Sequence, residues 1–330
     1  MSLKKIAEMT NVSISTVSRV LNNVSSTCAS KEVRDKIFAA AREIGYHPNE
    51  NARKLRTTND KAAARRHVSI VLARIRSLDT DPFFYELFRE LEIALLQRSI
   101  TIDHIIYAEE ELSQDISKSN GILIVGRCPH KLFQQITTAN RNVVAIWRNS
   151  MDFDVDQVIC DGRRAAELAM GHLISLGHKN IAYIGDCSYE SRYIGYCNSL
   201  INNDLPLNHK WIKETDQTKK TARTAFQELL EQTDDFSAVF CANDITAIGV
   251  LELLKEKRRQ IGRKISVISI DNIEDSQNTS PFLTTINIPR KEMVHMALLL
   301  LMDRIDKQHA ETVRIEFPCR IVNRSSCFEM

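Results

Sequence analysis

The chain has 330 residues, 43% hydrophobic and 26% charged, and this balance predicts a folded protein of more than one domain. No apolar run approaches the roughly 18 to 20 residues of a membrane helix, and the N-terminus MSLKKIAEMTN lacks a hydrophobic signal core. We therefore expect a mature cytoplasmic protein without membrane contact. Eight scattered cysteines form no CxxC motif and no paired Cys/His spacing, so we expect reduced, mostly buried thiols, no metal and no cofactor.

The formal net charge is only +2, but it is unevenly distributed. Residues 1–66 carry a net charge of +7, whereas the rest of the chain carries a net charge of −5. A basic head on a mildly acidic body suggests that the head binds a polyanion and that the body does not. Taken alone, the charge would favour a solvated basic face over a binding surface.

Three short helices are predicted in the head. The first covers residues 3–9 and ends at the TN that follows. A second begins after Ser13, whose hydroxyl can accept a backbone N–H of the first turn. The i, i+3, i+4 spacing gives this second helix a buried face and an opposite exposed face, Val17, Val20 and Leu21 against Ile14, Ser15, Ser18 and Arg19. A third helix is predicted from Glu32 to Ile44, with one apolar stripe made by Val33, Ile37, Ala40 and Ile44.

This order of elements is a helix-turn-helix, in which the second helix lies in the major groove of DNA. Small hydroxyl side chains allow close approach and bind phosphates, and an arginine can bind guanine O6 and N7. The stretch VSISTVSRVLNN, residues 12–23, combines these side chains with an apolar face for burial. It is therefore interpreted as a helix that reads duplex DNA.

From residue 67 the pattern changes to short β-branched runs that alternate with helical stretches. The runs are HVSIVLA, ITIDHIIY, GILIVG, NVVAIW, QVIC, NIAYIGD, AVFCAND and ISVISID, and the helical stretches include FFYELFRELEIALLQ, GRRAAELAMGHLISLG and DITAIGVLELLKEK. Such alternation predicts parallel sheets covered by helices on both faces, and its length favours two lobes. The preceding TTNDKAAARRH is polar and basic, as a flexible or conditionally helical linker would be.

LKKIAEMTNVSISTVSRVLN, followed by REIGYHPNENARKL, closely resembles the DNA-binding signature of the lactose/galactose-repressor family of bacterial transcription regulators. The resemblance implies an α-helical helix-turn-helix head and an α/β, two-lobed, periplasmic-binding-protein-like core with parallel sheets. The expected domains are the DNA-binding head 1–47, the hinge helix and linker 48–66, and the effector-binding and dimerisation core 67–330. Within the core, the N-lobe is expected at about 67–158 plus 289–318, and the C-lobe at about 159–288 plus 319–330.

The resemblance also assigns DNA contacts. Its positions imply three base-reading residues, Ile14, Ser15 and Arg19, and five phosphate contacts, Ser13, Thr16, Ser18, Tyr46 and Asn49. The chain departs from the family at Asn11, where glycine is usual in the turn. Because asparagine tolerates a left-handed backbone better than most residues, we expect the turn to be kept.

The segment PNENARKL resembles the hinge helix of the family. Pro48 would start this helix, Ala52 would approach the floor of the minor groove, and Leu55 would enter a base step. A helix this short is marginal alone, so it should form mainly on DNA and in a dimer. The alternative is an ordinary connector in which Leu55 packs against a domain.

The likeness extends through the core, in segments such as LISLGHKNIAYIGD, RYIGY and PFLTTINIPRKEM. In this family the effector binds in the cleft between the lobes, at the carboxyl ends of strands. The implied effector contacts are Arg192, Asn243 and Asp271, with Asp161 as a weaker candidate and Phe83, Phe84 and Trp147 as apolar walls. A guanidinium fork, an amide and a carboxylate suit adjacent sugar hydroxyls.

Each of these positions has a structural alternative. Asn243 and Asp244 precede a predicted helix and can simply cap it, whereas Asp271 and Asn272 can close a turn. Phe83 is as well suited to a core as to a pocket. The residue before Asp271 is an isoleucine where the family usually has phenylalanine or tyrosine, so the pocket wall differs and the resemblance does not fix the identity of the sugar.

Two other classes of protein are disfavoured. No GxGxxG or GxxxxGK[ST] motif follows a strand, GxSxG is absent, and the histidines are dispersed, so we expect no enzyme and no catalytic residue. A transport-type sugar-binding protein would carry a secretion signal and would lack a DNA-binding head.

The sequence therefore predicts a homodimeric repressor of a carbohydrate-utilisation operon. It would leave a pseudo-palindromic operator DNA when a small sugar effector binds, and GILIVG and DPFF favour a galactoside. The C-terminus carries no leucine heptad that would join dimers into tetramers. The alternative is a corepressor-dependent regulator of the same family that senses a purine or another metabolite.

Overall fold

The computed structural model describes residues 2–22, 28–46, 66–108, 112, 115–149, 151–188, 190–257 and 264–330. The chain divides into two compact units. Unit 1 comprises Met1–Ile146, Asp154–Val158 and Arg290–Arg314, and unit 2 comprises Trp147–Phe153, Ile159–Pro289 and Ile315–Met330. The chain therefore passes from one unit to the other several times, and each unit is assembled from segments far apart in the sequence.

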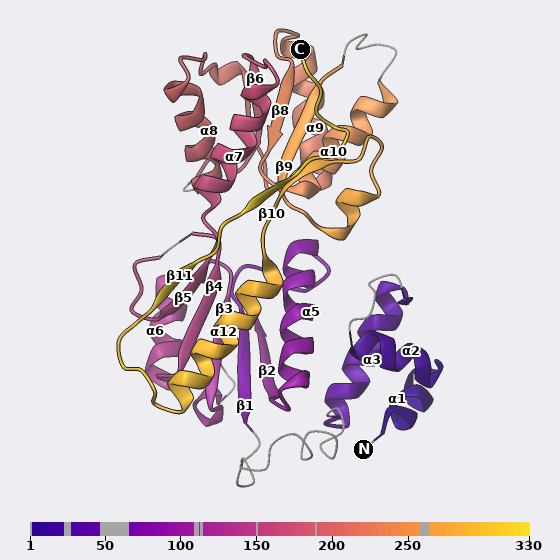
Figure 1. Cartoon of the computed structure of the whole chain (residues 1–330), viewed down its shortest axis with the longest axis vertical. Coiled ribbons are helices and arrows are strands. Elements are labelled where there is room, and N and C mark those ends of the chain that lie inside the picture. Colours follow the sequence, from indigo (N-terminus) through magenta and orange to yellow (C-terminus); the bar gives the residue numbers. More distant parts are fainter. Residues whose placement is uncertain are drawn as a thin grey trace. The chain divides into compact units, whose positions relative to one another are not determined.

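The head belongs to unit 1 and is built from three helices, α1 Leu3–Thr10, α2 Ile14–Leu21 and α3 Lys31–Glu43 (Figure 1). Its small core confirms the predicted apolar faces, because Ile6, Val17 and Ile37 are completely buried, and Val20 and Leu21 nearly so. Val33 and Ile44 pack against this core while remaining partly exposed. Three short helices thus bury one shared apolar cluster.

The turn between α1 and α2 confirms the prediction made for Asn11. This residue has φ 53° and ψ 42°, in the left-handed region, and its N–H donates to the carbonyl of Ala7 at the end of α1. The Ser13 hydroxyl then accepts the N–H of Thr16 at 3.1 Å and caps α2, as predicted. The turn is kept because asparagine is one of the few residues that adopts this backbone at low cost.

Among the described residues, the first sheet has six strands in the order β11-β5-β4-β3-β1-β2. The strands are β1 His67–Leu72, β2 Thr101–Tyr107, β3 Gly121–Val125, β4 Val143–Trp147, β5 Asp156–Ile159 and β11 Arg314–Glu316. β1 pairs with β2 and β3, and β3 with β4, all in parallel. The accompanying helices are α5 Pro82–Gln97, α6 His130–Ala139 and α12 Arg290–Ile305, together with the short 3-10 helix η2 Ile116–Lys118. α12 packs against both α5 and β3.

The sheet of unit 2 has six strands in the part of the chain that is described, in the order β12-β10-β9-β8-β6-β7. They are β6 Ile181–Gly185, β7 Ile212–Glu214, β8 Ala238–Cys241, β9 Ser266–Asp271, β10 Thr284–Asn287 and β12 Arg320–Val322. In this sheet β10 pairs with β12 in the antiparallel direction, whereas the pairs β10–β9, β9–β8, β8–β6 and β6–β7 are parallel. The helices are α7 Gly162–Ser175, α8 Ser191–Asn202, α9 Lys219–Gln232 and α10 Asp244–Glu256, with the 3-10 helices η3 His209–Trp211 and η4 Glu274–Gln277.

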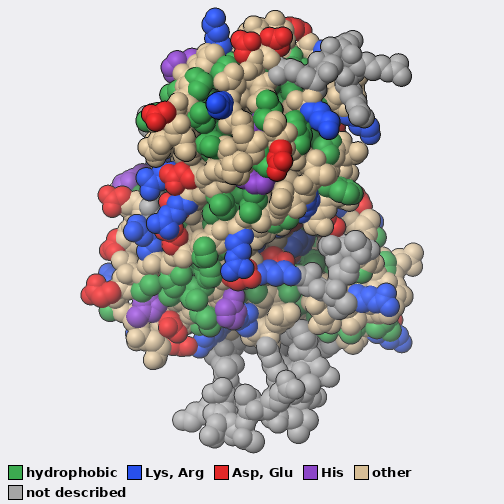
Figure 2. Space-filling model, turned by 45° about the horizontal axis from the view of Figure 1, so that its top comes forward, with side chains coloured by type: hydrophobic (Ala, Val, Ile, Leu, Met, Phe, Trp, Pro, Cys, Tyr) green, Lys and Arg blue, Asp and Glu red, His purple; other side chains and the backbone are tan. Residues whose placement is uncertain are grey.

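The helical head and the two mostly parallel sheets with their covering helices confirm the predicted fold class. The parallel strands are almost continuously apolar, because helices cover them; every residue of β3 and of β6 is buried. In unit 2, α7 packs against α8, and α9 packs against α10. Over the face shown in Figure 2, Lys and Arg side chains are interspersed with Asp and Glu, as expected for a body of small net charge.

The eight cysteines are free thiols in the structure, and they are less buried than predicted. Cys128, Cys160 and Cys241 are buried, whereas the others are only half-buried, Cys28, Cys187, Cys197, Cys319 and Cys327. The half-buried ones lie mostly in loops and in the C-terminal segment. Within the described ranges, no helix is long and apolar enough to cross a membrane, and no cluster of His, Cys, Asp and Glu could hold a metal ion.

Candidate DNA-reading helix and polar edge

The outward face of α2 carries the residues expected to read bases. Ile14, Ser15 and Arg19 are all exposed, and Ile14 is 49% exposed although it is a large apolar residue. Val17, Val20 and Leu21 anchor the opposite face in the head core. The three expected base readers are therefore presented together on one side of a short, firmly packed helix.

The hydroxyls at the start of α2 form a small hydrogen-bonded group. The Ser13 hydroxyl lies 2.8 Å from the hydroxyls of both Ser15 and Thr16. Since unpaired N–H groups at a helix N-terminus favour negative charge, this end of α2 suits a phosphate as well as a base edge. Ser18 lies one turn further on, half-exposed, and its carbonyl accepts the side-chain amide of Asn22 at 2.8 Å.

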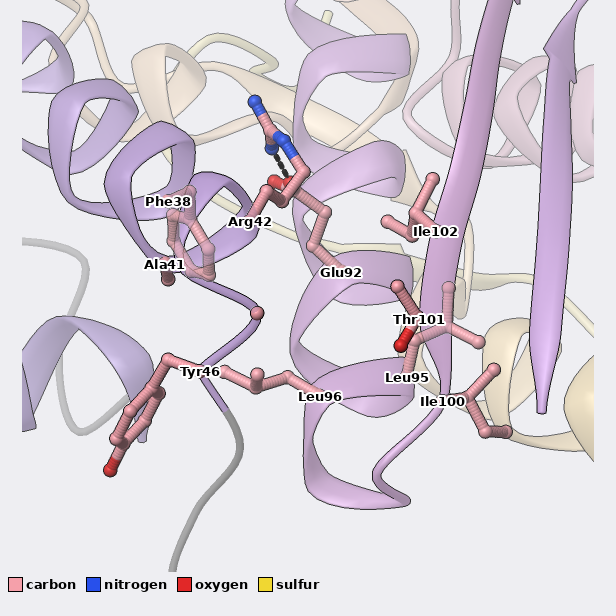
Figure 3. Close-up of a pocket in the computed structure, with 11 residues that line it drawn as sticks. Phe38, Ala41, Arg42, Tyr46, Glu92, Leu95, Leu96, Ile100, Thr101 and Ile102 are labelled. Atoms are coloured by element: carbon pink, nitrogen blue, oxygen red, sulfur yellow. Dashed lines mark ion pairs between the residues drawn. The ribbon is translucent and has the colours of Figure 1, made fainter. Parts of the chain in front are cut away.

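A different surface of the head contacts the rest of unit 1. Figure 3 shows Arg42 of α3 and Glu92 of α5 pointing toward each other and joined by an ion pair. Arg89 also forms an ion pair with Glu92, and with Asp35 of α3. Burial, and then the charge of Arg89, lower the pKa of Arg42. The buried carboxylate of Glu92 is thus neutralised by two guanidinium groups, one from each side of the contact.

Below this ion pair, the contact between α3 and α5 encloses a small pocket of about 50 Å³. Its apolar lining comes from both sides of the contact, Phe38 and Ala41 from α3 and Leu95, Leu96 and Ile100 from α5 and the residues after it (Figure 3). Tyr46, expected to contact phosphate, lines the same pocket and is half-buried, which raises the pKa of its hydroxyl. The contact with α5 uses α3, so the reading face of α2 stays exposed.

The other DNA-contact predictions lie outside the described residues. These are Pro48, Asn49, Ala52 and Leu55, together with the hinge helix that they would form. Their roles stay predictions.

In unit 2, polar side chains gather where neighbouring parallel strands end. Glu190 and Arg192 follow β6, Gln217 follows β7, Asn243 follows β8, and Asp271 is the last residue of β9. Because β7, β6, β8 and β9 are adjacent and parallel, their carboxyl ends share one edge of the sheet. We call this group of five side chains, with Arg148, the polar edge of unit 2.

Arg192 is the centre of the polar edge. It is only 3% exposed, and its guanidinium forms a two-point ion pair with Glu190, in which Nε and Nη2 each donate at 2.9 Å. Nη1 donates to the carbonyl of Ala242 at 2.6 Å, and Nη2 also reaches the side-chain oxygen of Gln217 at 3.0 Å. Burial would raise the pKa of Glu190, but the charge and hydrogen bonds of Arg192 lower it to about 2. The arginine therefore has its counterion within the chain.

Asp271 has a second arginine beside it. Its carboxylate lies 2.6 Å from the guanidinium of Arg148, which follows β4, and only 2% of the residue is exposed. The backbone of Asp271 has φ 135°, and Asn272 follows at φ 53°, so both residues hold a positive φ that non-glycine residues adopt infrequently. The charge of Asp271 also acts on Arg192. The polar edge thus contains two ion pairs, Arg192 with Glu190 and Arg148 with Asp271.

The two remaining polar candidates both cap helices. The side chain of Asn243 accepts the N–H of Thr246 at 2.9 Å and begins α10, and that of Asp161 accepts the N–H of Arg163 at 2.8 Å and begins α7. Capping is the structural alternative expected for Asn243. It leaves the amide nitrogen of that side chain available as a donor, so capping and effector contact are compatible.

Asp244 lies behind the polar edge and is completely buried. Its carboxylate accepts the hydroxyls of Ser269 and Thr285 and the N–H of Ile273. Burial, and then the nearby charge of Asp271, raise the pKa of Asp244 to about 7. This carboxyl group ties α10 to β9 and β10 and so supports the residues on either side of it.

The aromatic candidates are more buried than a pocket wall requires. Phe83 and Phe84 begin α5 in unit 1, are 5% and 6% exposed, and pack edge to face with ring centroids 5.5 Å apart. Phe84 also closes over Gly126, where an added Cβ would meet the ring at 2.8 Å. Trp147 ends β4, is 4% exposed and lies against Phe153. Their place in the cores matches the alternative interpretation of Phe83, and a role as effector walls stays a prediction.

Sequence reasoning missed three members of the polar edge, Arg148, Glu190 and Gln217. Arg148 had a usable signal, because a charged residue directly after the buried strand AIW falls at a sheet edge. Glu190 also had a sequence signal, because it is an acidic residue two positions before Arg192, and a buried arginine requires a counterion. Gln217 lies in a loop and had none.

Comparison with known proteins agrees with this geometry. Residues 2–49 match the model of bacterial regulatory proteins of the lacI family, and residues 170–327 match a periplasmic binding protein-like domain. The chain is 29% identical over 342 residues to the HTH-type transcriptional repressor CytR of Escherichia coli (strain K12), covering 98% of this chain and 96% of that repressor. The chain belongs to the lacI family of bacterial regulatory proteins.

Solved structures of lacI-family proteins have the same fold. The regulator from Enterococcus faecium with bound ribose superposes with a TM-score of 0.70 at 25% identity, covering 80% of this chain and all of that one. The lac repressor dimer bound to operator and an anti-inducer superposes with a TM-score of 0.68 at 22% identity, covering 99% of both chains. The protein is thus a lacI-family transcriptional regulator with a helix-turn-helix head and a periplasmic-binding-protein-like core.

Proposed function

We propose that this lacI-family protein is a homodimeric repressor of a carbohydrate-utilisation operon. In this proposal a pseudo-palindromic operator is released when a small sugar binds at the polar edge of unit 2. The observation that carries the proposal is the exposed face of α2, where Ile14, Ser15 and Arg19 lie together while the opposite face is anchored in a core. Two such heads in a symmetric dimer would contact two half-sites about one helical turn apart.

The chemistry of the polar edge supports a neutral, hydroxyl-rich effector. Arg192 is balanced by Glu190, and Asp271 by Arg148, so no net charge is available to attract an ionic ligand. Paired guanidinium and carboxylate groups still offer donors and acceptors to hydroxyls. The ribose in the Enterococcus faecium regulator is a ligand of this class.

Release of DNA requires only that the effector bind one conformation of the protein more tightly than the other. In this proposal, the head at 1–47 and the hinge and linker at 48–66 respond to ligand binding in the core at 67–330. The alternative is a corepressor, such as a purine, that strengthens operator binding. We retain this alternative because several related proteins carry the name repressor. A repressor can be released from DNA by its effector, or it can require its effector to bind DNA.

A thermal-shift screen of the full-length protein tests the effector part of the proposal. Neutral sugars, galactosides among them, and purine bases and nucleosides would be compared, because a ligand that binds only the folded state raises the Tm. We expect a sugar to raise the Tm of the wild type and to have a much smaller effect on Asn243→Ala. A purine that raises the Tm and strengthens operator binding would instead favour the corepressor.

A further inference from the structure

Two cysteines that are far apart in the sequence meet in unit 2. Cys160 follows β5 and is completely buried, whereas Cys319 lies between β11 and β12 and is half-buried. The N–H of Phe317 donates to the carbonyl of Ile159 at 2.9 Å, which holds the two backbones side by side. The thiols themselves share a hydrogen bond. Contact between thiols on adjacent, hydrogen-bonded backbones is the arrangement from which a disulfide forms without large movement.

The two thiols differ in environment. Cys319 lines a surface pocket of about 440 Å³, whose rim carries Arg164 and Glu316 as an ion pair at 3.2 Å. Cys160 lies behind it, out of contact with solvent. The hydrogen bond from Cys160 lowers the pKa of Cys319, and the same bond, followed by burial, raises the pKa of Cys160. Because the thiolate is the reactive form, Cys319 is the thiol that meets an oxidant first.

We propose that Cys160 and Cys319 are a peroxide-responsive thiol pair that forms a reversible disulfide. The Cys319 thiol loses its proton, and its thiolate attacks one oxygen of hydrogen peroxide, so that an S–O bond forms, the O–O bond breaks and hydroxide leaves. The hydroxide takes up the proton that the thiol released and becomes the first water. Cys160 then attacks the sulfenic sulfur, the S–S bond forms, and the hydroxyl leaves with the Cys160 proton as a second water. Two thiols are oxidised by two electrons, and one peroxide is reduced to two waters.

The position of the pair gives the bond a structural consequence. The chain enters unit 2 at Ile159 and again at Ile315, and the cysteines lie shortly after these two points. A disulfide would therefore fasten together two of the segments by which the chain enters unit 2. It would also close a long loop of the sequence, which raises the stability of the folded state. This inference is independent of the proposed operator and effector.

Peptide mapping of the full-length protein tests the proposal directly. Trypsin is expected to release Cys160 in residues 149–163 and Cys319 in residues 315–320, each as the only cysteine of its peptide. After exposure to hydrogen peroxide, removal of the excess and alkylation without reductant, we expect these two peptides to appear joined. Dithiothreitol should separate them, and the oxidised protein should have a Tm several degrees above that of the reduced protein.

Variants at the two positions and one matched control make the result specific. Cys319→Ser should abolish both the joined peptide and the Tm increase, and Cys160→Ser should leave a sulfenic acid at Cys319 that dimedone traps. Cys197→Ser, which removes another half-buried thiol of unit 2, should change neither readout. Folding of each variant is checked by circular dichroism. The proposal is wrong if peroxide leaves both wild-type peptides separate, or if Cys319 is joined mainly to a different cysteine.

Discussion

Arg19 is the residue of the reading face with the greatest capacity for sequence-specific contact. It is exposed on α2 and carries a guanidinium that can bind two acceptors of one guanine. Its neighbours Ile14 and Ser15 can supply an apolar and a hydroxyl contact but no charge. Loss of Arg19 should therefore remove specificity at one base position as well as affinity.

For Arg19→Ala we predict a loss of about 1 to 3 kcal/mol in operator binding, measured by fluorescence anisotropy on the preferred duplex and on point variants of it. Lys36→Ala is the matched control, because Lys36 is an exposed cation of α3 and lies off the reading face. That variant should weaken binding slightly and equally on all duplexes. Equal, uniform losses for the two variants would contradict the assignment of Arg19 as a base reader.

Glu190 is the counterion that holds Arg192 in place, and its substitution has a defined pH dependence. Because the pKa of Glu190 is about 2 when folded and near its ordinary value of 4.5 when unfolded, folding favours the ionised form. This stabilisation is fully present above about pH 4.5 and is lost as the pH falls toward 2.

We predict that Glu190→Gln lowers the free energy of unfolding by about 3 kcal/mol at pH 7, from the shift of the pKa. Urea unfolding at a series of pH values measures this, and the gap between wild type and variant should narrow steadily below about pH 4.5. A gap that is independent of pH would mean that packing, and not the ion pair, is what the substitution removes.

At the scale of elements, Asp156 joins three segments of unit 1. This buried residue of β5 accepts Nε and Nη2 of Arg304, at the end of α12, at 2.6 and 2.9 Å. It also pairs with His309 at 2.8 Å and accepts the N–H of Val313 at 2.8 Å. Burial would raise the pKa of Asp156, but these hydrogen bonds lower it overall. One carboxylate thus fixes α12 and the chain that leads to β11 against β5.

Asp156→Asn should lower the free energy of unfolding by about 3 kcal/mol, because the largely buried guanidinium of Arg304 stays charged but loses its counterion. Chemical denaturation at neutral pH is the measurement, with Asp152→Asn as a control at an exposed position in the same region. If both variants unfold at the same denaturant concentration as the wild type, Asp156 does not fasten these elements.

Most of the strands could be predicted from the sequence, whereas the three-residue strands could not. The eight apolar runs correspond to β1, β2, β3, β4, β5, β6, β8 and β9. Burial on both faces makes most of these strands visible as β-branched runs, although β2, at the edge of its sheet, is largely half-buried. The unpredicted strands β7, β11 and β12 have three residues each, so pairing with neighbours and not local pattern creates them. β10 was also not predicted, although it has four residues, as many as the predicted β5 and β8. The cap at Ser13 was predictable because the capping bond is local.

The polar edge was predictable in part. The family resemblance implied Arg192, Asn243 and Asp271 as effector contacts, and they lie in one region because parallel strands bring their carboxyl ends together. The partners of Arg192 come from a loop after β6 and a loop after β7, whose paths depend on the packed structure. The burial of Phe83 and Phe84 likewise depends on how α5 packs and does not follow from their sequence pattern.

At the scale of the whole molecule, the proposed function couples DNA binding by the head to effector binding by the core through thermodynamic linkage. If the effector weakens operator binding by some factor, the operator must weaken effector binding by the same factor. We predict that isothermal titration of the sugar into free protein and into the protein–operator complex gives Kd values in that ratio. The proposed coupling would be contradicted if the effector releases the protein from DNA but binds with the same Kd whether or not operator is present.

The central claim is that the exposed face of α2 recognises a particular duplex sequence, and selection from random duplexes by the full-length protein tests it most directly. We predict that the wild type enriches one pseudo-palindromic sequence and that Arg19→Ala relaxes the preference at one base position. If no sequence is enriched, with or without sugars and purines present, the claim is contradicted.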